Sequence, residues 1–357
     1  MFKAPPYRAP FWLPGAQLQT LWPALVSPRP HINWRRERWD TPDGDFIDVD
    51  FEADWPARGA RGDECADLRS RPHPDSEQGL RTVSNQGAAP RLVLFHGLEG
   101  DSNRPYARAL MAATRELGWQ GLVVHFRGCS GSLNRAPRAY HSGDSAEINW
   151  ILRRLRARYP SAPIIAAGVS LGGNALLKWL GEQGEAATQV IDVAAAICPP
   201  QDLHAGAASL SSGINRIYTE YFLRTLRPKA LAMAQTHPGL IDVDRVRRSR
   251  NFFDFDDAVT APLHGFTDCF DYWRRSSCRQ FLAGVRLPTL VINAHNDPFV
   301  PAACLAAPGD VSPQVRLDYS AGGGHVGFAS GAPPGHLAWL PSRIIAFAEE
   351  HLGARLG

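Results

Sequence analysis

Ser170 lies in the segment of this chain that is best suited to chemistry. An apolar run from Ile164 to Val169 leads through Gly-x-Ser-x-Gly into a helical pattern. A sharp strand-to-helix turn of this kind lifts a serine hydroxyl above a parallel sheet, where the hydroxyl can act as a nucleophile. Gly168 and Gly172 flank the serine, and side chains at those positions would collide where the strand and helix pack. The pentapeptide alone is weak support, but the strand before it and the helical spacing from Asn174 to Leu180 make it specific.

A serine hydroxyl needs a base to take its proton and an acid to orient that base. In this arrangement the acid and the histidine follow the serine along the chain, each after a later strand. Asp297 follows the predicted strand 289–293, and Asp202 is the alternative acid. His325 follows the last predicted strand, after three consecutive glycines that let the backbone bring an imidazole close to the serine. His295 neighbours Asp297, and we interpret it as a loop residue.

Acyl transfer also needs hydrogen-bond donors aimed at the developing oxyanion. The segment His96-Gly97-Leu98-Glu99-Gly100 follows the first central strand, where one such donor is expected. The backbone N–H groups of Leu98 and Leu171 are therefore the two candidates, and the alternative for the first segment is a plain turn at the end of a strand.

Strands and helices alternate from residue 91 onward, which is typical of a mostly parallel sheet with helices on both faces. We expect a single domain over 1–357 that opens with an antiparallel hairpin at 33–39 and 46–51. The segment 57–90 lacks periodicity and is predicted to be a mobile loop. The alternation fails again at 199–287, where we predict a helical cap over the serine, because caps in this position shape the substrate pocket. The remaining strands are expected at 92–95, 121–126, 164–167, 193–197, 289–293 and 315–319, with helices at 106–117, 145–159 and 337–351.

The composition is that of an ordinary globular protein. The 357 residues are 44% hydrophobic and 20% charged, and the formal net charge of +3 indicates no nucleic-acid partner. The six cysteines have no metal-ligand spacing, so we predict reduced thiols, no metal and no cofactor. The first residues do not resemble a secretory signal, which favours a cytoplasmic protein. The segment from Phe11 to Trp22 could make a peripheral membrane contact, although packing across the outside of the domain is the favoured interpretation.

Taken together, these motifs resemble the α/β-hydrolases and, more narrowly, the YheT-like branch with its abhydrolase-domain relatives. The resemblance covers most of the chain. It includes the segments 18–20, 96–100, 126–131, 140–144, 168–174 and 296–299, of which Phe-Arg-Gly-Cys-Ser-Gly and Tyr-His-Ser-Gly-Asp are the more specific. The segment 57–90 departs from the family as an insertion.

The resemblance implies an α/β-hydrolase fold with an inserted helical cap and an esterase or lipase acting on acyl esters, with those of acylglycerols and other lipids among the candidates. It carries over Ser170 as nucleophile, Asp297 as acid and His325 as base, and it assigns no role to Arg127 or Cys129 beyond ordering a loop. Two alternatives stay open. The same triad could transfer the acyl group to an acceptor other than water, or the chain could be a binding protein on a hydrolase scaffold. Acyl length, head group and oligomeric state lie beyond the sequence.

Overall fold

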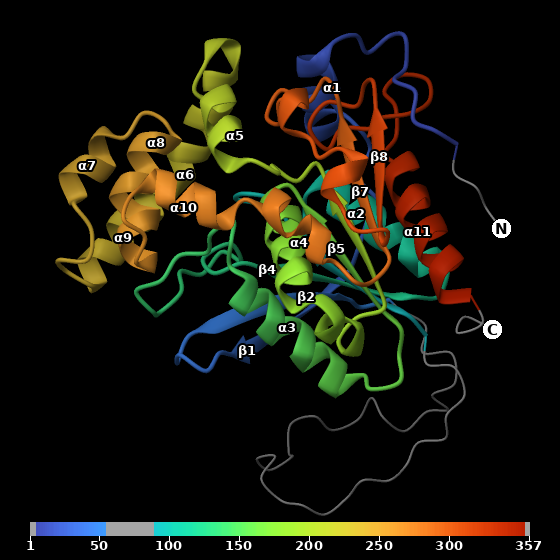
Figure 1. The fold of residues 1–357 in the computed structure, drawn as a ribbon, viewed down its shortest axis with the longest axis horizontal. Helices are drawn as coiled ribbons and strands as arrows, with labels where there is room; N and C mark the ends of the chain where they lie inside the picture. The colour runs from blue at the N-terminus through green and yellow to red at the C-terminus, as the bar shows by residue number, and fades with distance from the viewer. Residues whose placement is uncertain (1–4, 55–88, 354–357) are drawn as a thin grey trace, which may run out of the picture.

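A computed structural model describes residues 5–54 and 89–353. Its centre is one eight-stranded sheet with the strand order β1-β2-β4-β3-β5-β6-β7-β8 (Figure 1). The strands are β1 (Trp34–Asp40), β2 (Phe46–Glu52), β3 (Arg91–Phe95), β4 (Gln120–His125), β5 (Ile164–Val169), β6 (Val193–Ile197), β7 (Thr289–Ala294) and β8 (Val315–Ser320). β1 pairs antiparallel with β2, and β2 pairs antiparallel with β4, whereas all later neighbours are parallel. The predicted mostly parallel sheet and its leading hairpin are therefore confirmed.

Helices cover both faces of the sheet. The flanking helices are α2 (Pro105–Glu116), α3 (Ser145–Arg158), α4 (Leu171–Gln183) and α11 (Trp339–Leu352). One core joins α3 and α4 to Val93, Phe95 and their neighbours, and a second core joins α2 and α11 to Leu92 and Leu94. Alternate residues of one strand thus enter opposite cores, as a strand buried on both faces requires. Asp144 caps α3, because its side chain accepts a hydrogen bond from the backbone N–H of Glu147.

Helices also fill the segment between β6 and β7, at one end of the molecule (Figure 1). They are α5 (Leu203–Leu210), α6 (Arg216–Thr236), α7 (Val243–Arg248), α8 (Phe252–Phe255), α9 (Ala261–His264) and α10 (Cys269–Ser276), with the short turns η2 (Gly213–Asn215) and η3 (Asp256–Thr260). Several of them share a small core of their own that includes Leu223, Val246 and Phe255. This is the inserted helical cap that the sequence predicts. The next helix, η4 (Cys278–Gly284), returns to the main domain and packs against α4.

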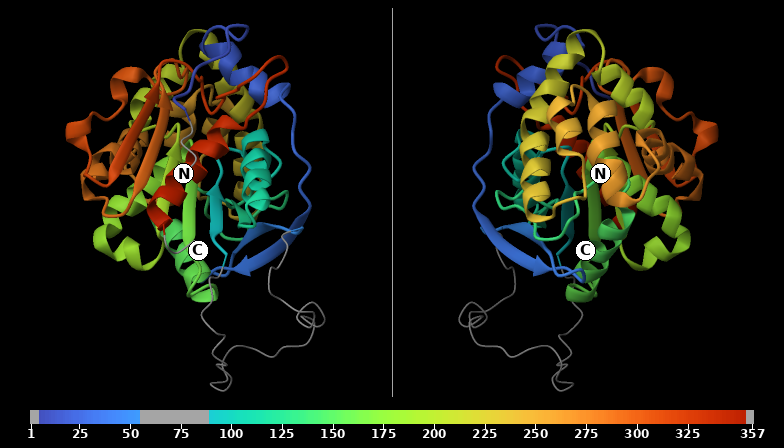
Figure 2. Two further views of the ribbon diagram at one scale, coloured as in Figure 1. Left: turned by 90° about the vertical axis from the view of Figure 1, so that its right-hand side faces the viewer. Right: turned by 90° about the vertical axis from the view of Figure 1, so that its left-hand side faces the viewer.

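The N-terminal segment contains α1 (Ala16–Leu25), which lies beside the loops that follow β7 and β8 (Figures 1 and 2). From its sequence we expected this segment to pack across the outside of the domain, without a helix. The remaining short helices are η1 (Gly184–Gln189), η5 (Ala302–Cys304) and η6 (Pro308–Asp310). Apart from residues 89 and 90, the loop predicted at 57–90 lies outside the described residues. Among the helices that the structure describes, none is both long and apolar enough to cross a bilayer.

Candidate active site

Ser170 lies at the turn between β5 and α4 with a backbone conformation of φ 52° and ψ −116°. A positive φ is unusual for a residue with a side chain, and strain of this kind is often found at active sites. The neighbouring glycines make the turn possible. A Cβ atom on Gly168 would lie 2.5 Å from the carbonyl oxygen of Gly172, and one on Gly172 would lie 2.5 Å from that of Phe95.

His325 lies between Ser170 and Asp297. Its Nε2 atom is 3.0 Å from Ser170 Oγ, and its Nδ1 atom is 2.8 Å from Asp297 Oδ2. An ionised carboxylate only accepts hydrogen bonds, so Nδ1–H donates to Asp297, and Nε2 is left to accept the proton of the serine hydroxyl. The other oxygen of Asp297 accepts hydrogen bonds from the backbone N–H groups of Phe299 and Val300. Both the orientation of the imidazole and that of the carboxylate are therefore set by hydrogen bonds.

The alternative residues lie elsewhere. The side chain of Asp202 caps α5 by accepting a hydrogen bond from the backbone N–H of Ala205. His295 is exposed in the loop after β7, where its backbone N–H donates to the carbonyl oxygen of Ser320. The structure thus brings Ser170, His325 and Asp297 together and leaves these two residues in other roles.

The predicted oxyanion donors come from two separate segments next to Ser170. Leu171 is the first residue of α4, so its backbone N–H has no acceptor within the helix. Leu98 follows Gly97, which lies against the serine: a Cβ atom on Gly97 would be 3.2 Å from Ser170 Cβ. His96 holds this loop, because its Nδ1 is 2.7 Å from the carbonyl oxygen of Gly97 and its Nε2 accepts a hydrogen bond from the backbone N–H of Phe126. Burial lowers the pKa of His96 to about 3, which keeps the imidazole neutral for this pair of bonds.

Residues of α1 hold the loop that carries His325. Thr20 Oγ1 accepts a hydrogen bond from the backbone N–H of His325, and Gln19 Oε1 accepts one from that of Gly323. Asn296 accepts a third, from Gly324. The segment 18–20 belongs to the family resemblance, but its sequence predicted no role for it. The contacts of Gln19 and Thr20 join residues about three hundred positions apart, so no local pattern could have predicted them.

The part of the chain that the structure describes contains one group of residues with donor atoms close enough to hold a metal ion: Cys198, Asp297 and His325. Two ligands of a tetrahedral zinc ion lie roughly 3.3 Å or more apart. His325 Nδ1 and Asp297 Oδ2 are 2.8 Å apart, which is the length of a hydrogen bond and shorter than the separation of two zinc ligands. Cys198 has a separate function, since its sulfur accepts a hydrogen bond from the backbone N–H of Val326 and burial raises the pKa of its thiol. The group therefore fits a hydrogen-bonded triad better than a metal site.

Comparison with known proteins places this geometry in a family. The family model described as alpha/beta hydrolase fold matches residues 90–332. The Escherichia coli protein YheT is 35% identical over 343 residues, which cover 96% of this chain and 92% of YheT. The chain belongs to the alpha/beta hydrolase family, in the branch of YheT. Phospholipase ABHD3 of Mus musculus is similar at 27% identity over 94% of this chain and 76% of its own length.

Solved structures agree with this fold. Est1E from Butyrivibrio proteoclasticus, a structure with bound ferulic acid, superposes with a TM-score of 0.53 at 14% identity. The match covers 88% of this chain and 99% of Est1E. At that identity the similarity supports the fold alone.

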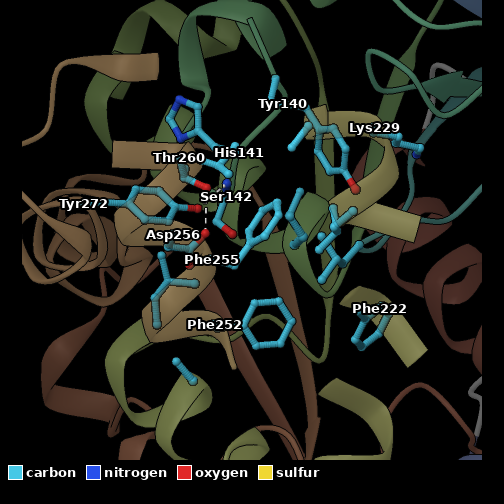
Figure 3. Close-up of a pocket in the computed structure, with 18 of the residues that line it drawn as sticks. Tyr140, His141, Ser142, Phe222, Lys229, Phe252, Phe255, Asp256, Thr260 and Tyr272 are labelled. Atoms are coloured by element: carbon cyan, nitrogen blue, oxygen red, sulfur yellow. Dashed lines mark hydrogen bonds between the residues drawn. The ribbon is translucent and has the colours of Figure 1, made fainter. Parts of the chain in front are cut away.

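In this member of the alpha/beta hydrolase family, a cavity of about 220 Å³ lies between the sheet and the cap (Figure 3). Ser170, His325, Leu98 and Leu171 all contribute to its wall. Most of the remaining wall is apolar and comes from the cap, with the side chains of Leu203, Leu210, Phe222, Leu226, Phe252 and Val259 among it. Ser170 therefore lies at the wall of a cavity that is suited to an apolar chain.

An ion pair connects the cap to the loop that contains Leu98, one of the predicted oxyanion donors. Lys229 of α6 lies 2.8 Å from the carboxylate of Glu99, which also accepts a hydrogen bond from the hydroxyl of Tyr140. Glu99 immediately follows Leu98 and has a positive φ of 52°.

Arg127 binds the carboxylates of Asp43, Asp45 and Glu147, which fits the predicted loop-ordering role.

Proposed function

We propose that this protein is a serine hydrolase that cleaves carboxylic esters, with Ser170 as nucleophile, His325 as general base and Asp297 as the acid that orients it. The observation that carries the proposal is the chain of hydrogen-bonding distances from Ser170 Oγ through His325 to Asp297, at the wall of a cavity. A serine hydroxyl in this arrangement is the activated nucleophile of acyl transfer.

The proposed reaction proceeds in two halves. Ser170 Oγ attacks the ester carbonyl while His325 Nε2 takes the hydroxyl proton, and the backbone N–H groups of Leu98 and Leu171 stabilise the oxyanion. His325 then returns the proton to the leaving alcohol, and an acyl-enzyme remains on Ser170. A water molecule, deprotonated by the same imidazole, attacks this ester and releases the carboxylic acid. The charge of Asp297 stabilises the imidazolium that forms in each half.

The apolar wall of the cavity favours esters with an aliphatic or aromatic acyl chain. Relatedness to an enzyme named phospholipase supports lipid esters, acylglycerols included, as the class to screen first. The proposed chemistry needs neither a metal nor a cofactor, so hydrolysis should persist in the presence of a chelator. A single hydrolase domain over the whole chain and a cytoplasmic location remain predictions.

The decisive experiment is labelling with a fluorophosphonate, followed by intact mass measurement and peptide mapping. We expect one adduct on Ser170 in the wild-type protein and no adduct in Ser170→Ala or His325→Ala. Hydrolysis of short-chain p-nitrophenyl esters should fall by a factor of roughly 10³ or more in both variants. Wild-type activity in Ser170→Ala, or labelling at another residue, would contradict the assignment.

We also propose a peripheral contact with lipid surfaces. The exposed apolar side chains of Phe11, Leu18, Leu25, Ile214 and Ile217 form what we call the α1/α6 surface. Gln17 of α1 donates a hydrogen bond to the side chain of Asn215, which joins the two parts. No acidic residue occurs between Pro5 and Trp34, where Arg8 and Arg29 are basic, so the α1 part of this surface suits an anionic membrane.

A further inference from the structure

The cavity has a polar region within its apolar wall. Asp256 and Thr260 both line it and lie in η3, close to Tyr272 and Ser142 (Figure 3). The hydrogen bonds of η3 are those of a π-helix, a rare conformation that occurs frequently at functional sites. Neither the triad nor the oxyanion donors involve these residues.

Asp256 is a partly buried carboxylate that lines the cavity. One carboxylate oxygen accepts a hydrogen bond from Thr260 Oγ1 at 2.6 Å, and the other accepts one from Trp273 Nε1 at 2.9 Å. Each oxygen has a second lone pair, so the carboxylate can accept further hydrogen bonds from the cavity side. Burial raises the pKa of Asp256 to about 6, and the group is still mainly ionised at neutral pH.

Other buried carboxylates near the cavity have a cationic partner. Glu99 pairs with Lys229, Asp144 with Arg138, and Glu147 with Arg127. Among the described residues, no arginine, lysine or histidine forms an ion pair with Asp256. A buried carboxylate without a counter-charge is costly. Asparagine would be a cheaper side chain if the position served only to accept bonds from Thr260 and Trp273.

The positions around Asp256 also argue against a purely structural role. The N-terminus of α8 is already capped by Asn251, whose side chain accepts a hydrogen bond from the backbone N–H of Asp254. The next acidic residue, Asp257, forms an ion pair with Arg245 and does not line the cavity. The carboxylate of Asp256, which has no ion-pair partner among the described residues, thus lies in the cavity wall, where a bound substrate can reach it.

We propose that Asp256, supported by Thr260, forms a subsite for a hydroxyl group of the ester substrate. A hydroxyl can donate a hydrogen bond to the carboxylate, and it loses far less hydration free energy than an ammonium ion on entering an apolar cavity. The inference rests on the proposed ester hydrolysis and adds that the preferred esters are hydroxylated. The hydroxyl can come from the acyl chain or from a polyol such as glycerol on the alcohol side.

Two pairs of esters test the subsite and distinguish these sources. For the acyl side, we would compare p-nitrophenyl octanoate with its ω-hydroxy analogue. For the alcohol side, we would compare propyl octanoate with monooctanoylglycerol. In one pair, kcat/KM of the wild-type protein should favour the hydroxylated ester by roughly tenfold, the size expected for a hydrogen bond to a charged group. In Asp256→Leu this preference should be lost or reversed.

Further variants keep the test informative if Asp256→Leu does not fold. Asp256→Asn has nearly the same shape without the charge, and it should reduce the preference several-fold. Asp254→Leu is the matched control, because Asp254 is exposed, lies two residues away and does not line the cavity. That control should retain the full preference.

Fluorophosphonate labelling of Ser170 distinguishes a failure of the proposed hydrolase function from a failure of the hydroxyl subsite. If labelling fails in the folded wild-type protein, the proposed hydrolase function is wrong. If labelling succeeds but neither pair shows a preference, or the preference persists in Asp256→Leu and Asp256→Asn, the hydroxyl subsite is wrong. The ω-amino analogue of p-nitrophenyl octanoate tests for a cation site. If the wild-type protein prefers this analogue to the ω-hydroxy ester, and Asp256→Asn loses that preference, the hydroxyl subsite is also wrong and Asp256 binds a cation.

Discussion

The side-chain oxygen of Thr20 accepts a hydrogen bond of 2.9 Å from the backbone N–H of His325. The same oxygen donates its own proton to the carbonyl oxygen of Ala16, so the hydroxyl is fixed within α1. An N-terminal helix thereby positions the imidazole that faces Ser170, on a loop that begins more than three hundred residues later.

We therefore expect Thr20→Val to lower kcat by about tenfold, because a small displacement of the imidazole weakens proton transfer from Ser170. The rate of fluorophosphonate labelling should fall in parallel. Thr20→Ser keeps both hydrogen bonds and should retain nearly wild-type values. Equal kcat in Thr20→Val and the wild-type protein would show that α1 does not position His325.

The ion pair between Lys229 and Glu99 leads to a second prediction. Lys229→Met leaves a buried carboxylate without its cation, next to the proposed oxyanion donor Leu98. We expect kcat to fall by about tenfold with a smaller change in KM, since the oxyanion forms only in the transition state. Arg227→Met, on the same helix, is the control, because Arg227 pairs with the exposed Glu220. A rise in KM with kcat unchanged would instead indicate that Lys229 acts in substrate binding.

The sequence predicted the sheet well, and the structure brings Ser170, His325 and Asp297 together, because both features depend on local signals. Each central strand is an apolar run buried on both faces, such as Ile164–Val169, and the glycines around Ser170 mark the turn that follows it. The supporting contacts could not be predicted in the same way. Gln19 and Thr20 contact the loop of His325 only in the folded protein. Pro23 lies inside α1, and a proline at that position argues against a helix when the sequence alone is considered.

The cap shows the same limit. Its aromatic residues indicated a packed helical insertion, and Phe252 and Phe255 are indeed buried. Nothing in the spacing of residues 254–257 distinguishes Asp256, which faces the cavity, from Asp254, which is exposed. Residues two positions apart in a helix lie on nearly opposite faces, so only the packing of α8 and η3 in the folded cap decides which of the two carboxylates lines the cavity.

Stability should depend on a buried cluster around Asp50. Burial alone would raise the pKa of this carboxyl, but hydrogen bonds from Arg36, His125 and Ser102 outweigh that effect and hold it well below its ordinary value. A carboxyl with a depressed pKa stabilises the folded state above its unfolded pKa of about 3.9 and loses that contribution as the pH falls. Asp50→Asn should therefore lower the free energy of unfolding by about 2 kcal/mol at neutral pH.

The difference between Asp50→Asn and the wild-type protein should shrink as the pH falls below about 4, because Asp50 of the unfolded wild-type chain then takes up a proton while the folded protein still holds the carboxyl ionised. Urea denaturation at several pH values measures this. Asp40→Asn is the control, since the Asp40 side chain is 85% exposed, and it should change the free energy of unfolding by less than about 0.5 kcal/mol. A difference that grows toward acid pH would contradict the account of Asp50.

Binding to membranes tests the α1/α6 surface. Leu25 and Ile217 are 71% and 66% exposed, and α6 continues from this surface to Phe222 and Leu226 in the cavity wall. Transfer of one such side chain into a bilayer contributes about 2 kcal/mol, so Leu25→Glu or Ile217→Glu should reduce partitioning onto anionic vesicles by at least tenfold. Co-sedimentation with phosphatidylserine-containing vesicles measures the bound fraction. Leu240→Glu is the matched control, because Leu240 is also exposed but lies beyond the opposite end of α6, roughly 30 Å away. If the wild-type protein does not sediment, or if Leu240→Glu weakens binding as much as Leu25→Glu does, this surface is not the one that meets the membrane.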